Sequence, residues 1–161
     1  MNERHRVREI KRGKKWFWLI IAILALGTTC FGYFSEYKPR AKAKNYASYA
    51  MITVTGVEFK FQDFMAGNYA EQEKIFASMP ALWSKFEEIE PPDENRTFQI
   101  MWKTAKLFEY TKLFMEHELK KKAALTTAEG TISPKEIAER IAELKFFINE
   151  TVAYGNFKKW R

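Results

Sequence analysis

The sequence predicts an all-α protein in which one transmembrane helix near the N-terminus precedes an exported bundle of about four helices. Two observations lead to this fold class. A stretch of nineteen residues without a charge lies between two clusters of basic residues. Beyond that stretch, apolar residues recur every three or four positions, which is the period of an amphipathic helix.

The uncharged stretch covers residues 16–34 and reads WFWLIIAILALGTTCFGYF. As a helix rising about 1.5 Å per residue it would reach roughly 28 Å, which is close to the hydrocarbon thickness of a bilayer. Aromatic residues that favour the membrane–water interface stand at both ends, namely Trp16, Trp18, Tyr33 and Tyr37. We therefore predict a single span with these four side chains at head-group level.

Basic residues flank the predicted span unequally. Residues 1–15 hold seven Lys or Arg against two Glu, whereas residues 35–44 hold four against one. The positive-inside tendency predicts a cytoplasmic tail over 1–15, a basic link at lipid head groups over 35–44, and an exported domain over 45–161. The expected location is a bacterial inner membrane with the domain in the periplasm. That domain is close to neutral, which argues against nucleic-acid binding.

The apolar stretch has two other interpretations. A cleaved signal peptide could end at the Ala-Leu-Gly of residues 25–27, but the apolar run continues to Phe34. A lipoprotein could be acylated at Cys30, but the Gly-Thr-Thr of residues 27–29 fits the usual preceding pattern poorly. A span is therefore favoured. Cys30 is the only cysteine, so the chain forms no internal disulfide.

The segment 45–66 has a helical apolar stripe and a competing strand pattern. The stripe consists of Tyr46, Ala50, Val54, Val57, Phe61 and Phe64. Residues 51–61 also contain β-branched and alternating positions that suit a strand. A lone strand would leave backbone groups unpaired unless another protein supplied an edge, so a helix is favoured.

Three further helices are predicted, over residues 69–90, over residues 96–122, and from Ser133 to near Gly155. Pro80 is expected to kink the first of these or to divide it into two short helices. The expected core stripes are Ile75, Met79, Leu82, Phe86 and Ile89; Phe98, Met101, Ala105, Phe108, Met115 and Leu119; and Ile137, Ile141, Leu144, Ile148 and Val152. Four helices with short connections predict an antiparallel bundle.

The residue inventory predicts no catalytic, cofactor-binding or metal site, and thus no enzyme. The two histidines, His5 and His117, fall on opposite sides of the predicted membrane. No cysteine cluster, glycine-rich phosphate loop or nucleophile motif is present. The acidic run over residues 87–94 lacks calcium-loop spacing and is expected to be a solvated loop.

Aromatic residues are abundant, with 14 Phe, 7 Tyr and 5 Trp. Several lie outside the predicted stripes, where they would either broaden the core or form a protein-facing surface, because aromatics are enriched in interface cores. The interface candidates are Trp102, Tyr110, Phe114, Phe146, Phe147, Phe157 and Trp160.

These features lead to two functional hypotheses. The first is a non-catalytic, structural or accessory subunit of a membrane assembly, which contacts other subunits or a second copy through its exported helices. The alternative is an extracytoplasmic sensor that binds a small ligand between helices and signals through a partner.

The sequence also contains two motifs of the N-glycosylation type. Asn95-Arg96-Thr97 has the form of an N-glycosylation acceptor, and Asp93 adds the acidic position used by some bacterial systems. Asn149 begins a second such motif, but Asn95 is preferred because a loop is expected there.

Overall fold

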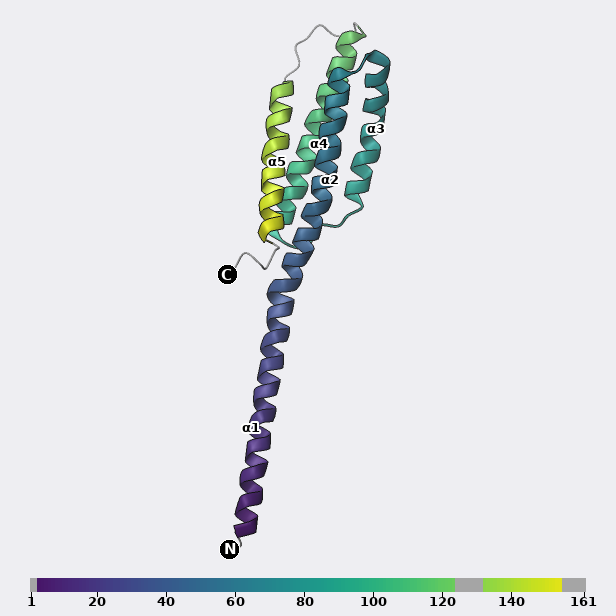
Figure 1. Ribbon diagram of the computed structural model, residues 1–161. Coiled ribbons are helices and arrows are strands. Elements are labelled where there is room, and N and C mark those ends of the chain that lie inside the picture. The colour runs from purple at the N-terminus through teal and green to yellow at the C-terminus, as the bar shows by residue number, and fades with distance from the viewer. Residues whose placement is uncertain (1–2, 124–131, 155–161) are drawn as a thin grey trace. The chain divides into compact units, whose positions relative to one another are not determined.

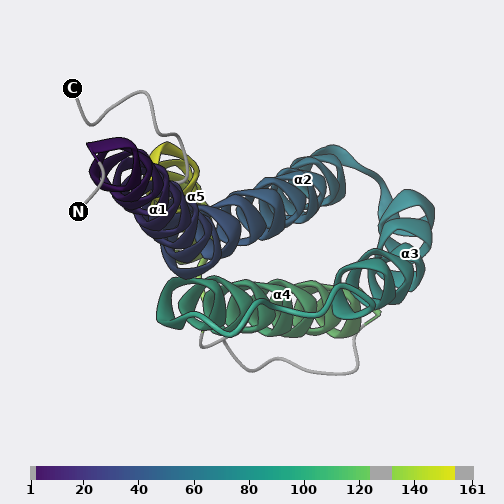
Figure 2. The ribbon, with the colours of Figure 1, turned by 90° about the horizontal axis from the view of Figure 1, so that it is seen from below.

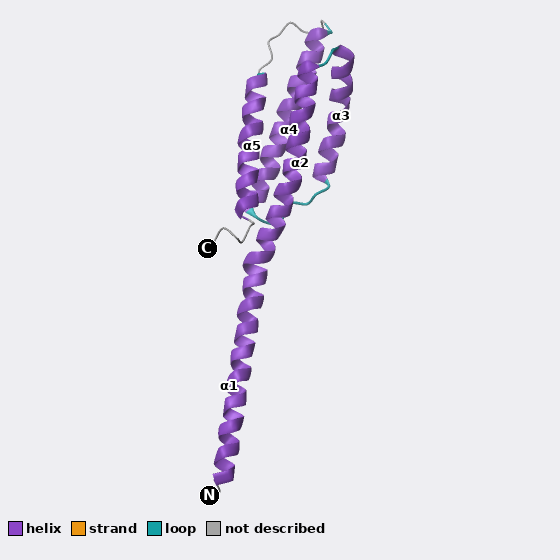
Figure 3. Cartoon of the chain, viewed as in Figure 1, coloured by secondary structure: helices purple, strands orange, loops and turns teal. Residues whose placement is uncertain are grey.

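The computed structural model describes the backbone of residues 3–123 and 132–154, and the side chains of residues 16–123 and 132–153. Within these residues the chain is helical and contains no strand (Figure 3). The prediction of an all-α protein is confirmed, and the strand interpretation of residues 51–61 is wrong for this chain, because a helix covers that segment.

The chain divides into two compact units, residues 1–39 and 40–161, which are described separately. The first unit contains α1 (Glu3–Gly32) followed by a short π-helix (Tyr33–Tyr37). This helical stretch near the N-terminus is long and apolar enough to cross a membrane. Its most apolar window has a mean hydropathy of 1.9, with none of that window buried.

The segment expected as a separate link, residues 35–44, is helical. The Lys38 N–H donates to the Tyr33 carbonyl, five residues back, and α2 (Lys38–Ala66) begins at that lysine. The wider π turn comes directly before Pro39, which has no N–H to continue an ordinary helical ladder. The chain therefore stays helical through the proline.

The second unit is an antiparallel bundle, as the sequence predicted. After α2 come α3 (Tyr69–Glu87), α4 (Asn95–Lys122) and α5 (Pro134–Tyr154), and successive helices alternate in direction (Figure 1). Viewed along the bundle, each helix lies beside its neighbour in sequence, and α5 returns to lie beside α2 (Figure 2). An ion pair between Glu58 and Lys145 joins those two helices.

Two of the helices begin with capping groups that the sequence encodes. The Asn68 side chain accepts from the Glu71 N–H at 3.1 Å, and the Glu71 carboxylate accepts from the Asn68 N–H at 2.9 Å. This reciprocal pair is a capping box that starts α3. At the start of α5, the Ser133 hydroxyl accepts from the Glu136 N–H at 3.1 Å, while Pro134 occupies the first helical position.

Proline does not divide α3. The helix runs through Pro80 from Tyr69 to Glu87, so the alternative of two short helices is wrong. Two hydrogen bonds lie one turn earlier. The Ser78 hydroxyl donates to the Ile75 carbonyl, and the Lys60 ammonium of α2 donates to that hydroxyl, both at 2.6 Å. Buried residues on both sides of the proline, Met79 and Phe86, keep the two halves in one helix.

The core of α2 is the one that the sequence predicted. All six residues of its expected stripe are buried, and they join one cluster with residues of the other three helices. In α5, four of the five expected residues are buried, and Thr151 takes the place next to the half-buried Val152.

The core face of α4 overlaps the predicted one only in part. Phe98, expected inside, is 48% exposed. Phe108 and Met115 of the predicted stripe are buried, and two seven-residue series lie inside with them: Thr97, Thr104 and Thr111, and Ile100, Leu107 and Phe114. Such a repeat is the seam of helices packed at a shallow angle.

Buried threonine is tolerated in this seam because its hydroxyl is satisfied within its own helix. The Thr104 hydroxyl donates to the Ile100 carbonyl at 2.7 Å, and the Thr111 hydroxyl donates to the Leu107 carbonyl at 2.8 Å. A buried polar group with a hydrogen bond avoids most of its desolvation cost. The γ-methyl groups then pack as aliphatic side chains do.

A buried glutamine connects three helices. Gln72 of α3 donates through Nε2 to the Phe64 carbonyl at 2.7 Å and accepts through Oε1 from the Lys122 ammonium at 2.8 Å. Phe64 belongs to the last turn of α2, where carbonyls lack intrahelical donors. Gln72 therefore caps the C-terminus of α2 from a neighbouring helix.

We expect Gln72→Leu to lower the free energy of unfolding by about 1–3 kcal/mol, because the Phe64 carbonyl would be left buried without its donor. Denaturant unfolding of the two proteins measures this difference. Gln62→Leu, on the exposed side of α2, is the matched control and should change stability by less than about 0.5 kcal/mol. Equal losses in both variants would contradict the capping role.

Burial of the Tyr46 hydroxyl predicts that the protein loses stability at high pH. Desolvation raises the pKa of the Tyr46 hydroxyl to about 12. Since the ordinary value is near 10, the unfolded chain loses this proton first, so stability is complete below about pH 10 and falls as the pH rises toward 12. The loss across this range should be about 2 kcal/mol larger in the wild type than in Tyr46→Phe, as measured in denaturant melts. Tyr49→Phe, at a half-exposed position, should retain the wild-type loss.

Candidate functional site

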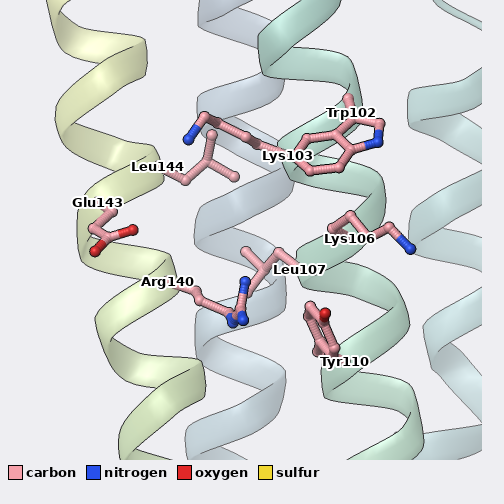
Figure 4. A pocket seen from close by; sticks show the side chains of 8 residues that line it. All are labelled: Trp102, Lys103, Lys106, Leu107, Tyr110, Arg140, Glu143 and Leu144. Atoms are coloured by element: carbon pink, nitrogen blue, oxygen red, sulfur yellow. The ribbon is translucent and has the colours of Figure 1, made fainter.

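A groove runs between α4 and α5 on the outside of the bundle (Figure 4). It encloses about 160 Å³ and is lined by Trp102, Lys103, Lys106, Leu107, Tyr110, Arg140, Glu143 and Leu144. Leu107 and Leu144 are almost fully buried and form an apolar floor. Polar and aromatic side chains stand around this floor, so the groove combines an apolar base with a charged rim.

Two cation–aromatic contacts cross from one helix to the other. The Arg140 guanidinium of α5 lies 4.2 Å from the ring centroid of Tyr110 on α4, and Figure 4 shows the two side chains facing each other. In the opposite sense, the Lys103 ammonium of α4 lies 5.7 Å from the ring centroid of Phe147 on α5. Both contacts follow from the antiparallel register of the helices, because residue numbers rise along one helix as they fall along the other.

The cations of the groove differ in how they are neutralised. Arg140 is held by the Glu136 carboxylate, with an Nη2–Oε1 distance of 2.8 Å, and this hydrogen bond raises the pKa of the arginine. Lys106 pairs with Glu109 at 2.8 Å in an exposed pair of the kind that contributes little to stability. Lys103 has no carboxylate partner within the described part of the chain. The rim therefore keeps one cation that is available to a ligand.

The predicted interface residues fall into different environments. Trp102 is 60% exposed at the groove, Tyr110 lines it, and Phe147 is half-buried beside it. Phe146 is 67% exposed and is not among the lining residues. The remaining two candidates, Phe157 and Trp160, lie outside the described residues.

Phe114 does not fit the surface to which the sequence assigned it. It is only 5% exposed, and its ring centroid lies 5.7 Å from that of Phe61 and 6.4 Å from that of Phe64. The assignment is corrected because α4 turns its threonine series inward, which brings Phe114 into the core on the same side.

Several groove residues were not singled out from the sequence. Lys103, Lys106, Arg140 and Glu143 are charged residues on helices, and such residues are usually solvated. Their positions next to core residues could have identified them from the sequence. Arg140 directly precedes the buried Ile141, and Lys103 directly precedes the buried Thr104. Residues flanking a core series face the neighbouring helix.

A second set of large apolar side chains is exposed on α2. Tyr49, Ile52 and Phe59 are 52%, 68% and 60% exposed. Their spacing of three and seven places them on one side of the helix. Within the described residues, these three side chains are not part of the bundle core.

The predicted membrane-interface residues all have exposed side chains. Trp16 and Trp18 lie in α1, and Tyr33 and Tyr37 lie at the two ends of the π-helix. The rings of the two tyrosines are stacked with centroids 5.3 Å apart. Their place at a membrane–water interface stays a prediction.

Asn95 was expected in a loop, but it is the first residue of α4. Within the motif, Thr97 is fully buried, and its hydroxyl donates to the carbonyls of Pro92 and Glu94 at 2.6 and 2.7 Å. The hydroxyl that a glycosylation motif must present is therefore engaged in the folded domain.

The described residues hold no group of three His, Cys, Asp or Glu side chains that could bind a metal ion. Comparisons with protein-family models, with curated proteins and with solved structures find no match. The groove between α4 and α5, with its apolar floor and charged rim, is accordingly the candidate site on geometric grounds.

Proposed function

We propose that this protein is a non-catalytic, membrane-anchored accessory subunit that holds other proteins through its helical bundle. In this proposal the apolar N-terminal helix crosses a bacterial inner membrane with its basic end in the cytoplasm, and the bundle lies in the periplasm. The positive charge of residues 1–15 supports that orientation.

The observation that carries the proposal is the exposure of large aromatic side chains on a bundle whose core is already filled. Trp102, Phe146 and Phe59 are each at least 60% exposed, although the core cluster draws residues from all four helices. Tryptophan, tyrosine and phenylalanine are enriched at protein interfaces, where their burial contributes much of the binding energy.

The size of the groove favours a protein partner over a small ligand. Pockets for small molecules usually enclose about 300–1,000 Å³. The groove encloses about 160 Å³, which is room for one anchoring side chain. Such narrow pockets with an aromatic rim are typical of the places where an interface seats a hot-spot residue.

The test is purification of the full chain from native membranes in a gentle detergent through a C-terminal tag, followed by native sizing and mass spectrometry. We expect a large particle in which other proteins are present in fixed stoichiometry. A monomer or dimer of this chain alone, at several detergent concentrations, would overturn the proposal.

A sensor remains the second candidate, because a shallow depression lies at the turn between α2 and α3. It has a volume of about 440 Å³ and is lined by Asp63, Ala66, Gly67, Glu71, Lys74 and Ile75. Four of these six residues are exposed, so a ligand there would stay largely in solvent. A ligand-dependent rise in melting temperature that Lys74→Ala removes would favour this candidate.

A further inference from the structure

The apolar floor and charged rim of the groove between α4 and α5 determine which kind of occupant fits it. Its floor, Leu107 and Leu144, is apolar, so an occupant gains by placing an apolar side chain there. Its α4 wall includes the exposed indole of Trp102 and the ring of Tyr110, against which such a side chain can pack. One large aliphatic or aromatic residue therefore fits the base of the groove.

The rim carries one cation, Lys103, that has no carboxylate partner among the described residues. Lys103, Lys106 and Arg140 line the groove against a single carboxylate, that of Glu143. Two of these cations already have carboxylate neighbours on their own helices, Glu109 and Glu136. The Lys103 ammonium lies over the Phe147 ring and forms no ion pair within the described residues. A carboxylate next to the anchoring residue would pair with Lys103.

From this juxtaposition we infer that the α4–α5 groove docks an acidic amphipathic segment of a partner protein, which inserts one large apolar side chain onto Leu107 and Leu144 and a carboxylate against Lys103. The inference rests on the proposed function and names the partner chemistry and the surface. A helix suits the groove because residues at i and i+4 of an occupant place an anchor and a carboxylate on one face.

A lipid head group fits the same groove less well. Its phosphate would meet the cations, but its polar body would lie over the apolar floor, where a peptide can place an apolar side chain. A peptide can also direct a backbone or side-chain donor to Glu143. The observations therefore favour a polypeptide occupant.

The first experiment measures binding directly. The full chain in phosphatidylcholine nanodiscs is titrated with a fluorescent helical peptide of roughly 15 residues carrying a leucine–phenylalanine stripe and flanking glutamates. We expect Lys103→Glu to weaken binding by about tenfold or more, and Trp102→Ala to weaken it to a similar extent. A peptide with lysines in place of the glutamates should bind at least about tenfold more weakly.

The matched control is Lys112→Glu, which makes the same charge change at an exposed position of α4 outside the groove. It should bind the acidic peptide within about twofold of the wild type. Thermal unfolding of each variant shows whether the fold survives. Equal weakening by Lys103→Glu and Lys112→Glu, or no binding of the acidic peptide to the wild type, overturns the inference.

The second experiment identifies the occupant in cells. A photo-crosslinking benzoyl-phenylalanine replaces Lys106 in the groove or, for comparison, Phe59 on α2. A crosslink from the groove position to a protein segment with acidic residues beside a large apolar residue, lost when Lys103→Glu is added, supports the inference. A crosslink to a second copy of this chain or to lipid overturns it.

The two proposals fail in different ways. A stable assembly whose crosslinks come from the Phe59 position, and none from the groove, overturns the groove assignment and leaves the accessory-subunit proposal standing. A chain that purifies alone and gives no protein crosslink from either position overturns both.

Discussion

Replacing Phe114 with alanine is expected to lower the free energy of unfolding by about 3–5 kcal/mol. The ring is 5% exposed and packs edge-on against Phe61 and Phe64 of α2, so truncation would leave a cavity between two helices. Since small domains are stable by only about 5–15 kcal/mol, the variant should be partly unfolded at moderate temperature. Urea titration followed by circular dichroism measures the change.

The matched control is Phe146→Ala, which removes the same ring from a position that is 67% exposed. That change should alter stability by less than about 0.5 kcal/mol. If both variants lost several kcal/mol, Phe146 would have to be covered in the isolated chain. If neither did, the core described for α4 would be wrong.

The contrast between these two residues shows that a hydrophobic pattern does not always predict which side chains are buried. Phe114 and Phe146 were both assigned to an interface, because both lay outside the stripe of their helix. For α2 the stripe was right, since every residue that faces inward there except Thr53 is strongly apolar or alanine. A hydrophobic pattern identifies such a helix face without knowledge of its neighbours.

In α4 the inward series contains Thr97, Thr104 and Thr111, and threonine counts as polar in any hydrophobic pattern. The predicted stripe therefore included the exposed Phe98 in place of its neighbour Thr97, although Phe108 and Met115 of the same stripe are buried. A threonine hydroxyl that donates to a carbonyl of its own helix no longer opposes burial. The sequence does not tell which threonines form this hydrogen bond, whereas the folded bundle shows it for Thr104 and Thr111.

The groove is harder to predict from the sequence than the bundle. Tyr110 and Arg140 are thirty residues apart in the chain, and their contact depends on the register between two antiparallel helices. Helix periodicity predicts which face of each helix is apolar, but it carries no information on how far one helix slides along another. Trp102 and Tyr110 were found from aromatic excess, whereas their cationic neighbours were not.

Placing an arginine at the centre of the apolar stretch should remove the chain from membranes. Leu24 lies near the middle of residues 16–34 and is 62% exposed. An arginine at the centre of a spanning helix costs about 2.5–3.5 kcal/mol, which is roughly a hundredfold in the insertion equilibrium. We expect Leu24→Arg to shift the protein from the carbonate-resistant membrane pellet to the soluble or degraded fraction.

Gln99→Arg supplies the control, because it adds the same side chain at an exposed position of α4 and should stay in the pellet. A chain that remains in the pellet with arginine at position 24 would be held by something other than a span. Two treatments distinguish a spanning helix from electrostatic attachment of the basic tail, residues 1–15, to anionic lipid. Removing the tail abolishes the electrostatic attachment, and high salt screens it, whereas neither treatment releases a spanning helix. Salt-resistant and arginine-sensitive attachment together would therefore identify a membrane-crossing helix.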